Sequence, residues 1–494
     1  MIDASTTPLA NVKLALIGLG PHARRINYPY IEQQVQDQHL ANLSLVVELD
    51  ESEPIVNEYM DKRTLRPQQI VFISAKDNRN PTVIDQKAAD ALAQQGITHA
   101  IIATEPKSHK AYLAYCIEHG IKVLTDKPIT APLDLMPHPD FYDEQHMFDA
   151  SNQLVSDVEE LVSKLGDFPE SRVIVQTQRR YHAGYQHVHA LLDKIVKQAG
   201  IPITYLSIMH SDGMWNMPSE IESREGHPYK YGYGKLLHSG YHFIDLMHTL
   251  LSINQQLVAK QPDKVSVFSQ ILRPVDHAEI INEADYRQFF GEGDFKMPHG
   301  SRADDDDMTF GELDNYSQWQ FTKDGKVMTT AQLSLMQSGF SLRAWPHLPQ
   351  DTYKANGRVR HEMVNIHVGP LYNIQVHSYQ SAEVGDNDGK RNGVGSKNHF
   401  DIYVFRNAKL LGGEPLEVLH YGDQDDTSHS LYLGQNEQPR YAPIHELLRD
   451  LPSRSELSNH LPTNRLMGML YSNQAKQQFG QIPYTERHYK EIFS

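Results

Sequence analysis

The sequence predicts two domains, an N-terminal α/β domain with a doubly wound parallel sheet and a C-terminal α+β domain with a large, mostly antiparallel open sheet. Short apolar runs alternate with helical stretches in the first part of the chain, whereas longer runs of alternating character dominate afterwards. We therefore expect one domain at residues 1–180 and a second, with insertions, at 181–494. A chain of 494 residues is long enough to bury two separate cores.

Short apolar runs in the first domain are expected to be buried parallel strands, because a strand covered on both faces carries apolar residues continuously. These runs are residues 12–17, 43–47, 70–73, 99–103, 121–124 and 172–175. Helical stretches separate them, at about 23–39, 85–95, 110–119 and 151–165. Gly96 and Gly120 directly follow two of these stretches and suit the C-terminal caps of helices.

Extended runs of alternating character are expected to form the antiparallel sheet of the second domain. They are residues 205–210, 265–271, 316–321, 327–336, 362–368, 374–379 and 400–405. Further helices are expected near residues 186–198, 236–251, 443–449 and 464–479. The acidic run 304–307 is expected to be a solvated loop, because contiguous aspartates lack the alternate spacing of a calcium-binding loop.

Composition excludes several classes of partner and site. Asp and Glu number 62 against 46 Lys and Arg, and the net charge of −16 disfavours nucleic acids and anionic membranes as partners. Cys116 is the single cysteine, which excludes an internal disulfide and a multi-thiolate metal site. We expect no resident metal. No apolar run is long enough for a signal peptide or a transmembrane helix, so we expect a cytoplasmic protein.

A glycine-rich hexapeptide, Gly18–Ala23, follows the first predicted strand and opens a helix. It fits the pattern G-x-G-x-x-G/A, in which the first glycine allows a tight turn and the second lets a phosphate approach the backbone. Pro21 suits the first helical turn, and the helix N-terminus offers N–H groups to a pyrophosphate. An ordinary glycine-rich turn is the alternative interpretation.

Glu48 lies at the end of the second predicted strand. A carboxylate there accepts hydrogen bonds from ribose hydroxyls and repels a 2′-phosphate, so it favours NAD over NADP as the cofactor. Arg24 and Arg25 lie close enough to weaken that preference. The alternative interpretation is that Glu48 is the solvent-facing end of a strand.

Two longer motifs resemble the Gfo/Idh/MocA family of oxidoreductases, typified by glucose–fructose oxidoreductase and inositol dehydrogenases. Residues 101–109 and 120–128, on either side of one helix, are similar to the family's ATPPxxH and GKHVLxEKP, with Glu105 for a proline and Asp126 for a glutamate. Residues 234–245 resemble G-x-L-x-D-x-G-x-H-x-x-D, with His238 in place of the aspartate. Residues 179–181 resemble an arginine-containing strand end of the family's site.

The resemblance implies an NAD(P)-dependent oxidoreductase that transfers a hydride between nicotinamide and a carbinol of a sugar, cyclitol or sugar derivative. It also implies a homo-oligomer, a dimer or a tetramer, because the family's open sheets commonly pair. The chain is longer than members of this family usually are. We expect the extra residues, most of them after residue 270, to decorate the sheet or an assembly interface.

Lys127, His242 and His238 are the candidate catalytic residues. The reaction needs a group that moves the hydroxyl proton and a cation that stabilises the developing alkoxide, and the motif assigns both to Lys127. His242 is a candidate acid/base, and Asp245 would orient it or bind a substrate hydroxyl. His238 and His242 are spaced to chelate a metal on an α-helix, which keeps a zinc hydrolase as an alternative.

The motifs and the resemblance together predict two sets of binding residues. The cofactor-binding residues are Gly18, Gly20, Pro21, His22, Ala23, Glu48, Thr104, Glu105, His109, Asp126, Lys127 and Arg180. The substrate-binding residues are Lys127, Tyr181, Trp215, His238, His242 and Asp245. Two further alternatives remain open: an NAD-dependent glycosidase of the same family, and a non-catalytic regulator that binds dinucleotide and ligand.

Overall fold

The computed structural model describes residues 9, 11–78, 81–131, 144–224, 229–296, 311–347, 357–381, 394, 398–421 and 438–494. The acidic run 304–307 lies outside these residues. The chain forms two compact units. One contains Met1–Leu133, Gln153–His182 and Asp425–Leu461; the other contains Asp134–Asn152, Ala183–Gln424 and Pro462–Ser494. The sequence predicts one boundary, near residue 180, whereas the chain also returns to the first unit close to its C-terminus.

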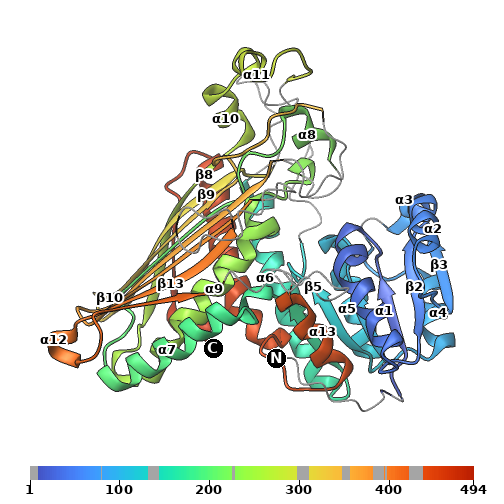
Figure 1. Ribbon diagram of the computed structural model, residues 1–494, viewed down its shortest axis with the longest axis horizontal. Coiled ribbons are helices and arrows are strands. Elements are labelled where there is room, and N and C mark those ends of the chain that lie inside the picture. Colours follow the sequence, from blue (N-terminus) through green and yellow to red (C-terminus); the bar gives the residue numbers. More distant parts are fainter. Residues whose placement is uncertain are drawn as a thin grey trace. The chain divides into compact units, whose positions relative to one another are not determined.

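A six-stranded parallel sheet of order β3-β2-β1-β4-β5-β6 forms the first unit (Figure 1). Its strands are β1 Leu14–Ile17, β2 Leu43–Leu49, β3 Gln69–Ile73, β4 His99–Ile102, β5 Lys122–Asp126 and β6 Arg172–Gln176. All neighbouring strands pair in parallel. The winding reverses between β1 and β4, as in doubly wound dinucleotide-binding sheets. The predicted fold class is confirmed for this unit.

Helices cover both faces of the parallel sheet. The helices are α1 Tyr28–Gln36, α2 Glu53–Asp61, α3 Ala75–Asn78, α4 Gln86–Gln95, α5 Pro106–Glu118 and α6 Glu144–Asp167. Two apolar clusters, one formed with α4, α5 and α6 and the other with α1 and α2, contain alternate residues of the strands. Helix α5 begins before the predicted Lys110, because Pro106 occupies its first turn, where a missing N–H is not needed. Gly96 has φ +60° at the end of α4, as predicted for a cap.

The C-terminal segment 438–461 completes the covering of this sheet. Helix α13, Tyr441–Leu448, places Tyr441, Ile444 and Leu447 in the apolar cluster that contains the β1 residues Leu14 and Leu16. A segment close to the C-terminus of the sequence therefore builds part of the first unit. The expectation that the extra residues decorate the second domain's sheet or an interface stays a prediction.

A nine-stranded sheet of order β14-β13-β12-β11-β7-β10-β9-β8-β15 forms the second unit (Figure 1). Its strands are β7 Tyr205–Ser211, β8 Lys264–Leu272, β9 Asp314–Lys323, β10 Lys326–Met336, β11 Val359–Val368, β12 Tyr372–Ser381, β13 Asn398–Arg406, β14 Leu416–His420 and β15 Tyr484–His488. Only β7 and β10 pair in parallel among these neighbours. The predicted mixed, mostly antiparallel sheet is confirmed.

In the part of the chain that the structure describes, the helices that pack on this sheet lie on one face, and the other face, called the open face here, carries exposed residues. The helices of the unit are α7 Ala183–Ala199, α8 Pro218–Ser223, α9 Tyr241–Leu251, α10 Pro274–Ile280, α11 Glu283–Phe290, α12 Ala408–Leu411, α14 Leu461–Gln478 and α15 Tyr489–Phe493. On the covered face, Asn473 of α14 donates from Nδ2 to the Val267 carbonyl of β8 at 3.1 Å. On the open face, Phe268, Met363 and Phe405 are each more than one third exposed.

None of the helices that the structure describes is both long enough and apolar enough to span a bilayer.

Candidate functional site

The glycine loop between β1 and α1 has the shape that a dinucleotide requires. Gly18 has φ +89°, and a Cβ there would lie 2.7 Å from the Ala103 carbonyl oxygen, so only glycine fits. A Cβ on Gly20 would meet nothing within 4 Å, which leaves that part of the backbone open to a ligand. Ala23 is fully buried against the sheet. The residues present therefore fit a dinucleotide pyrophosphate.

Helix α1 is preceded by a π-helical turn, Ala23–Asn27. The Arg24 N–H donates to the Gly20 carbonyl at 3.0 Å, so helical bonding begins at the glycine loop itself. Pro21, inside this first turn, is exposed. Single π-helical turns are uncommon and occur often at functional sites.

Glu48, at the end of β2, turns its carboxylate toward the glycine loop. Its Oε2 accepts a hydrogen bond from the Leu19 N–H at 2.5 Å, and its Oε1 accepts one from the Leu49 N–H at 2.8 Å. The carboxylate thus lies beside the loop, in the position from which such a group contacts ribose hydroxyls.

His22, Asp126, Lys127 and Arg440 gather at the carboxyl ends of β1 and β5. His22 Nε2 lies 3.9 Å from Asp126 Oδ2, and Arg440 Nη1 lies 3.2 Å from His22 Nδ1. Burial is the main reason why the pKa of His22 falls from 6.5 to about 4; Asp126 opposes the fall, and Arg440 adds to it. His22 is therefore a neutral ring at pH 7, so the fixed charges of this cluster are those of Asp126, Lys127 and Arg440.

The predicted cofactor residues after β4 have different surroundings. His109 is fully buried, with Nδ1 at 2.9 Å from the Pro128 carbonyl and Nε2 at 3.1 Å from the Thr104 carbonyl. It joins the loop after β4 to the loop after β5, and burial lowers its pKa. Glu105 is the exposed residue that precedes α5.

Arg180 and Tyr181 bind the C-terminal segment. Arg180 donates from Nη1 to the Arg454 carbonyl at 2.8 Å and from Nη2 to the Asn459 carbonyl at 3.0 Å. The Tyr181 hydroxyl donates to Glu446 Oε2 at 2.6 Å. Both residues are thus part of the contacts that hold segment 438–461 on the first unit. Their predicted roles toward cofactor and substrate stay predictions.

The second motif forms a π-helical turn, Leu236–Gly240, that continues into α9. His238 lies in the π-helical turn and its ring is 5.0 Å from that of Tyr229. His242 is 6% exposed and Asp245 is 1% exposed, both on α9, and Asp245 Oδ1 accepts from the Thr463 hydroxyl at 2.9 Å. Across the described residues, no group of three or more His, Cys, Asp or Glu side chains is arranged to hold a metal ion.

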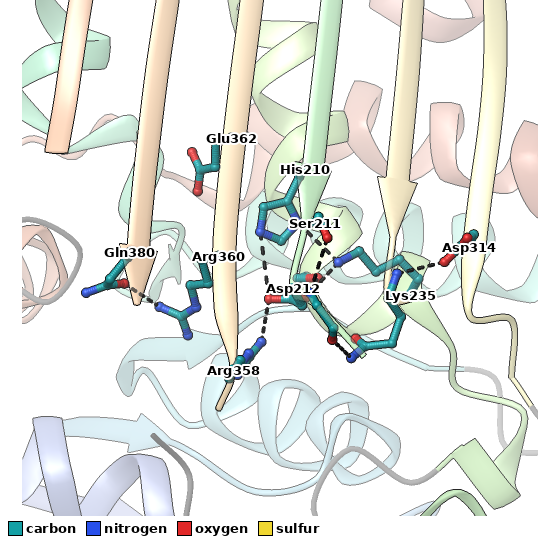
Figure 2. A network of polar contacts seen from close by, with 12 residues as sticks. His210, Ser211, Asp212, Lys235, Asp314, Arg358, Arg360, Glu362 and Gln380 are labelled. Atoms are coloured by element: carbon teal, nitrogen blue, oxygen red, sulfur yellow. Dashed lines mark hydrogen bonds and ion pairs between the residues drawn. The ribbon is translucent and has the colours of Figure 1, made fainter. Parts of the chain in front are cut away.

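A buried polar network adjoins this motif, where β7 ends and β11 begins (Figure 2). Asp212 is its centre. Asp212 Oδ2 accepts hydrogen bonds from Lys235 Nζ at 2.6 Å and from the Ser239 hydroxyl at 2.7 Å, and Oδ1 accepts one from Arg358 Nη2 at 2.5 Å. His210 Nδ1 lies 3.1 Å from Lys235 Nζ. Lys235, directly before the π-helical turn, and Ser239, inside it, both belong to the motif of residues 234–245. The network therefore includes two residues of this motif.

The charges of this network are mutually dependent. Burial would raise the pKa of Asp212, but Arg358 and Lys235 outweigh it and hold that pKa well below its usual range. Burial lowers the pKa of Lys235, which is fully buried, and Asp212 opposes that change. The ring of Trp215, 2% exposed, lies under the Arg358 guanidinium at 5.0 Å and under the Arg224 guanidinium at 4.3 Å.

Glu312 fixes the start of the second motif. Its Oε1 accepts from the Leu236 N–H at 2.7 Å and its main-chain carbonyl accepts from the Lys235 N–H at 2.8 Å. Gly234 packs so closely on Glu312 that a Cβ there would collide with it. Glu312 is fully buried, and burial raises its pKa from 4.5 to about 7.

The sequence does not single out Asp212, Lys235, Arg358 or Arg440 as site residues. Asp212 follows a predicted strand and Lys235 lies inside the quoted motif, which are the only local signals. Arg358 and Arg440 lie far from either motif in the sequence, and only the folded chain brings them to Asp212 and to His22.

Comparison with known proteins finds a family model that matches part of the first unit. Residues 12–137 match the Gfo/Idh/MocA model, an oxidoreductase family with an NAD-binding Rossmann fold. No curated protein matches the sequence significantly.

Several solved structures share the fold over almost the whole chain. An Agrobacterium radiobacter oxidoreductase in complex with NAD+, L-tartaric acid and magnesium is 13% identical, with a TM-score of 0.54 over 97% of this chain and 99% of that one. A proposed NADPH-dependent oxidoreductase from Desulfitobacterium hafniense is 12% identical, with a TM-score of 0.52 over 98% and 99%. The aldose–aldose oxidoreductase of Caulobacter crescentus, complexed with glycerol, is 12% identical, with a TM-score of 0.51 over 97% and 99%.

At these identities the likeness to the solved structures concerns the fold alone, and the family model covers residues 12–137. The resemblance predicted from the sequence is confirmed for residues 12–137, which match the model of the Gfo/Idh/MocA oxidoreductases with their NAD-binding Rossmann fold.

Proposed function

We propose that this protein is an NAD-dependent oxidoreductase that transfers a hydride between nicotinamide and a carbinol of a sugar, cyclitol or sugar derivative. The observation that carries the proposal is the Gly18–Ala23 loop with the Glu48 carboxylate beside it. Bound NAD supplies the hydride acceptor or donor at its nicotinamide ring.

The preference for NAD over NADP rests on Glu48. Its carboxylate lies at the end of β2 and contacts the glycine loop through the Leu19 N–H. A ribose 2′-hydroxyl can donate to such a carboxylate, whereas a 2′-phosphate would be repelled by it. NADP would also need a cation in this position, and Glu48 is an anion.

Lys127 and His242 are the proposed proton-handling residues. Lys127 follows Asp126 at the end of β5. Burial would raise the pKa of Asp126, but His22, Lys127 and Arg440 outweigh burial and lower that pKa. Asp126 is therefore an anion beside the lysine. His242 projects from α9, and its imidazole, 6% exposed, is the proposed acid/base group. Asp245 on the same helix is the proposed orienting carboxylate.

The class of substrate is supported by the buried network around Asp212. Hydroxyl and ammonium donors already converge on this carboxylate, from Ser239 and Lys235, beside the motif that carries His238 and His242. A polyol presents the same kinds of donor and acceptor.

We also propose a homo-oligomer in which a second copy of this chain covers the open face of the nine-stranded sheet. One row of this face, read across neighbouring strands, is uncharged: Phe268, Gln318, Gln332, Ser207, Asn365, Gln375 and Tyr403. Depletion of charge with exposed aromatic residues is typical of subunit interfaces. Light scattering of the purified protein should give the mass of a dimer or tetramer, and a monomer would contradict this part of the proposal.

A panel of sugars and polyols, followed at the absorbance of reduced nicotinamide with NAD+ and NADP+, tests the activity. We expect turnover with NAD+, its loss in Lys127→Ala, and unchanged turnover in the exposed control Lys62→Ala. Full activity of Lys127→Ala would remove Lys127 from the mechanism. Bound dinucleotide without turnover of any compound would contradict the dehydrogenase and favour the glycosidase or the regulator.

A further inference from the structure

We propose that Arg440 binds the pyrophosphate of the dinucleotide, so that the C-terminal segment 438–461 contributes a residue to the cofactor site. The inference rests on the proposed function and adds to it a residue far from both sequence motifs. Three independent observations carry it: the way in which the backbone of Arg440 is held, the position of its guanidinium, and the charge around the glycine loop.

The backbone of Arg440 is fixed to the first unit from both sides. Gln176, at the end of β6, donates from Nε2 to the Arg440 carbonyl at 3.1 Å. The next residue, Tyr441, is 1% exposed and stacks on Tyr30 of α1, with ring centroids 5.2 Å apart and planes at 12°. A side chain that starts from such a fixed backbone reaches the same place at little cost in conformational entropy, which is what a binding residue needs.

The guanidinium of Arg440 reaches the glycine loop. Its Nη1 lies 3.2 Å from Nδ1 of His22, the residue that precedes Ala23 in the loop. Since burial, with Arg440 adding to its effect, lowers the pKa of His22 to about 4, the ring is neutral at pH 7. A neutral ring accepts the arginine N–H at Nδ1, and its own N–H then lies on Nε2, the atom nearest to Asp126. His22 thus positions the guanidinium by a hydrogen bond and does not neutralise its charge.

The charge around the loop is opposite to that of the protein. The chain carries −16, yet the charged groups that act on His22 are one carboxylate, Asp126, and three cations, Arg440, Arg25 and Lys127. With the Glu48 carboxylate, which accepts from the Leu19 N–H of the loop, the three cations still outnumber the two carboxylates. A pyrophosphate carries negative charge that must be met locally against the field of an acidic protein. Arginine also offers paired N–H donors that match phosphate oxygens, so Arg440 supplies geometry as well as charge.

The test is the affinity of three ligands for the unchanged protein and its Arg440→Gln variant, measured by titration calorimetry. NAD+ and ADP-ribose contain the pyrophosphate, and adenosine does not. We expect Arg440→Gln to raise the Kd of NAD+ and of ADP-ribose roughly 10- to 100-fold, the loss of one charge-assisted contact, and to leave that of adenosine unchanged. Arg440→Lys keeps the positive charge but lacks the paired N–H donors of the guanidinium. Its Kd values for NAD+ and ADP-ribose should lie between those of the unchanged protein and those of Arg440→Gln.

Arg454→Gln is the matched control, because Arg454 is exposed on the same segment and loses the same charge. It should bind all three ligands as the unchanged protein does. Equal Kd values for NAD+ in Arg440→Gln and the unchanged protein would overturn the inference, and so would an equal loss for all three ligands, which marks a structural role. If Arg440→Gln does not fold, full NAD+ affinity in Arg440→Met, which keeps the aliphatic stem, would overturn it equally. Failure of the unchanged protein to bind NAD+ would instead overturn the proposed function.

Discussion

Glu312 is a fully buried carboxyl group, and its replacement by glutamine predicts a defined change in how stability depends on pH. Burial raises the pKa of Glu312 from 4.5 to about 7. Between these two values the folded protein keeps a proton that the unfolded chain has lost. The free energy of unfolding therefore falls as the pH rises from about 4.5 to about 7, and the stabilising effect of the neutral carboxyl is lost above that range.

The size of this effect follows from the shift itself. One pKa unit corresponds to about 1.4 kcal/mol, so ionisation of Glu312 should lower the free energy of unfolding by up to about 3 kcal/mol. Glu312→Gln keeps the oxygen that accepts the Leu236 N–H but never ionises. We expect the variant to equal the unchanged protein near pH 4.5 and to exceed its stability by about 2–3 kcal/mol at pH 8.

Urea unfolding followed by tryptophan fluorescence at the two pH values measures the difference. Glu279→Gln serves as the control, because Glu279 is an exposed residue of the same unit and should show no such pH-dependent gain. A constant difference between Glu312→Gln and the unchanged protein at both pH values would refute the reasoning, and so would a variant that loses stability relative to it as the pH rises.

Three other substitutions have expected outcomes. Asp212→Ala should cost about 3–5 kcal/mol of unfolding free energy, because Lys235 would be left as a buried charge without its carboxylate; an unchanged urea midpoint would contradict this. Gly18→Ala should abolish NAD+ binding in calorimetry and lower the free energy of unfolding by about 1–3 kcal/mol, because Gly18 has a positive φ and a Cβ there would collide with Ala103. An unchanged affinity for NAD+ would contradict this expectation. Glu48→Gln should weaken NAD+ binding roughly 10-fold while NADP+ binding stays equal or improves, and an equal loss for both nucleotides would contradict the assigned role.

The sequence predicts the parallel sheet well because its central strands are buried on both faces and read as mostly apolar runs. Residues 14–17 and 99–102 are examples. The predicted ends of helices are less accurate where a single residue determines them, as Pro106 does at the start of α5. The sequence also predicts the helix near residues 443–449, but its apolar pattern does not say which sheet it covers. That helix is α13, and it packs on the first unit.

The site is predictable where neighbouring residues form a motif and not where the fold joins distant ones. The glycine loop with its positive φ at Gly18 follows from the spacing of small residues. The partners of Asp212 come from the start of β11, from Lys235 and from Ser239, and no local pattern links Arg358 to residue 212. The π-helical turn that carries His238 also escapes a prediction based on α-helical spacing, because it changes the phase between residues 238 and 242.

Native mass spectrometry of the purified chain with NAD+ tests the central claim most directly, because dinucleotide binding is the step on which every other proposal depends. The account predicts a complex with one NAD+ per chain, and its loss in Gly18→Ala while Gly166→Ala, a helical glycine whose Cβ would meet no atom within 4 Å, keeps it. A chain that forms no complex with NAD+ or NADP+, or a Gly18→Ala variant that binds NAD+ as the unchanged protein does, would contradict the account.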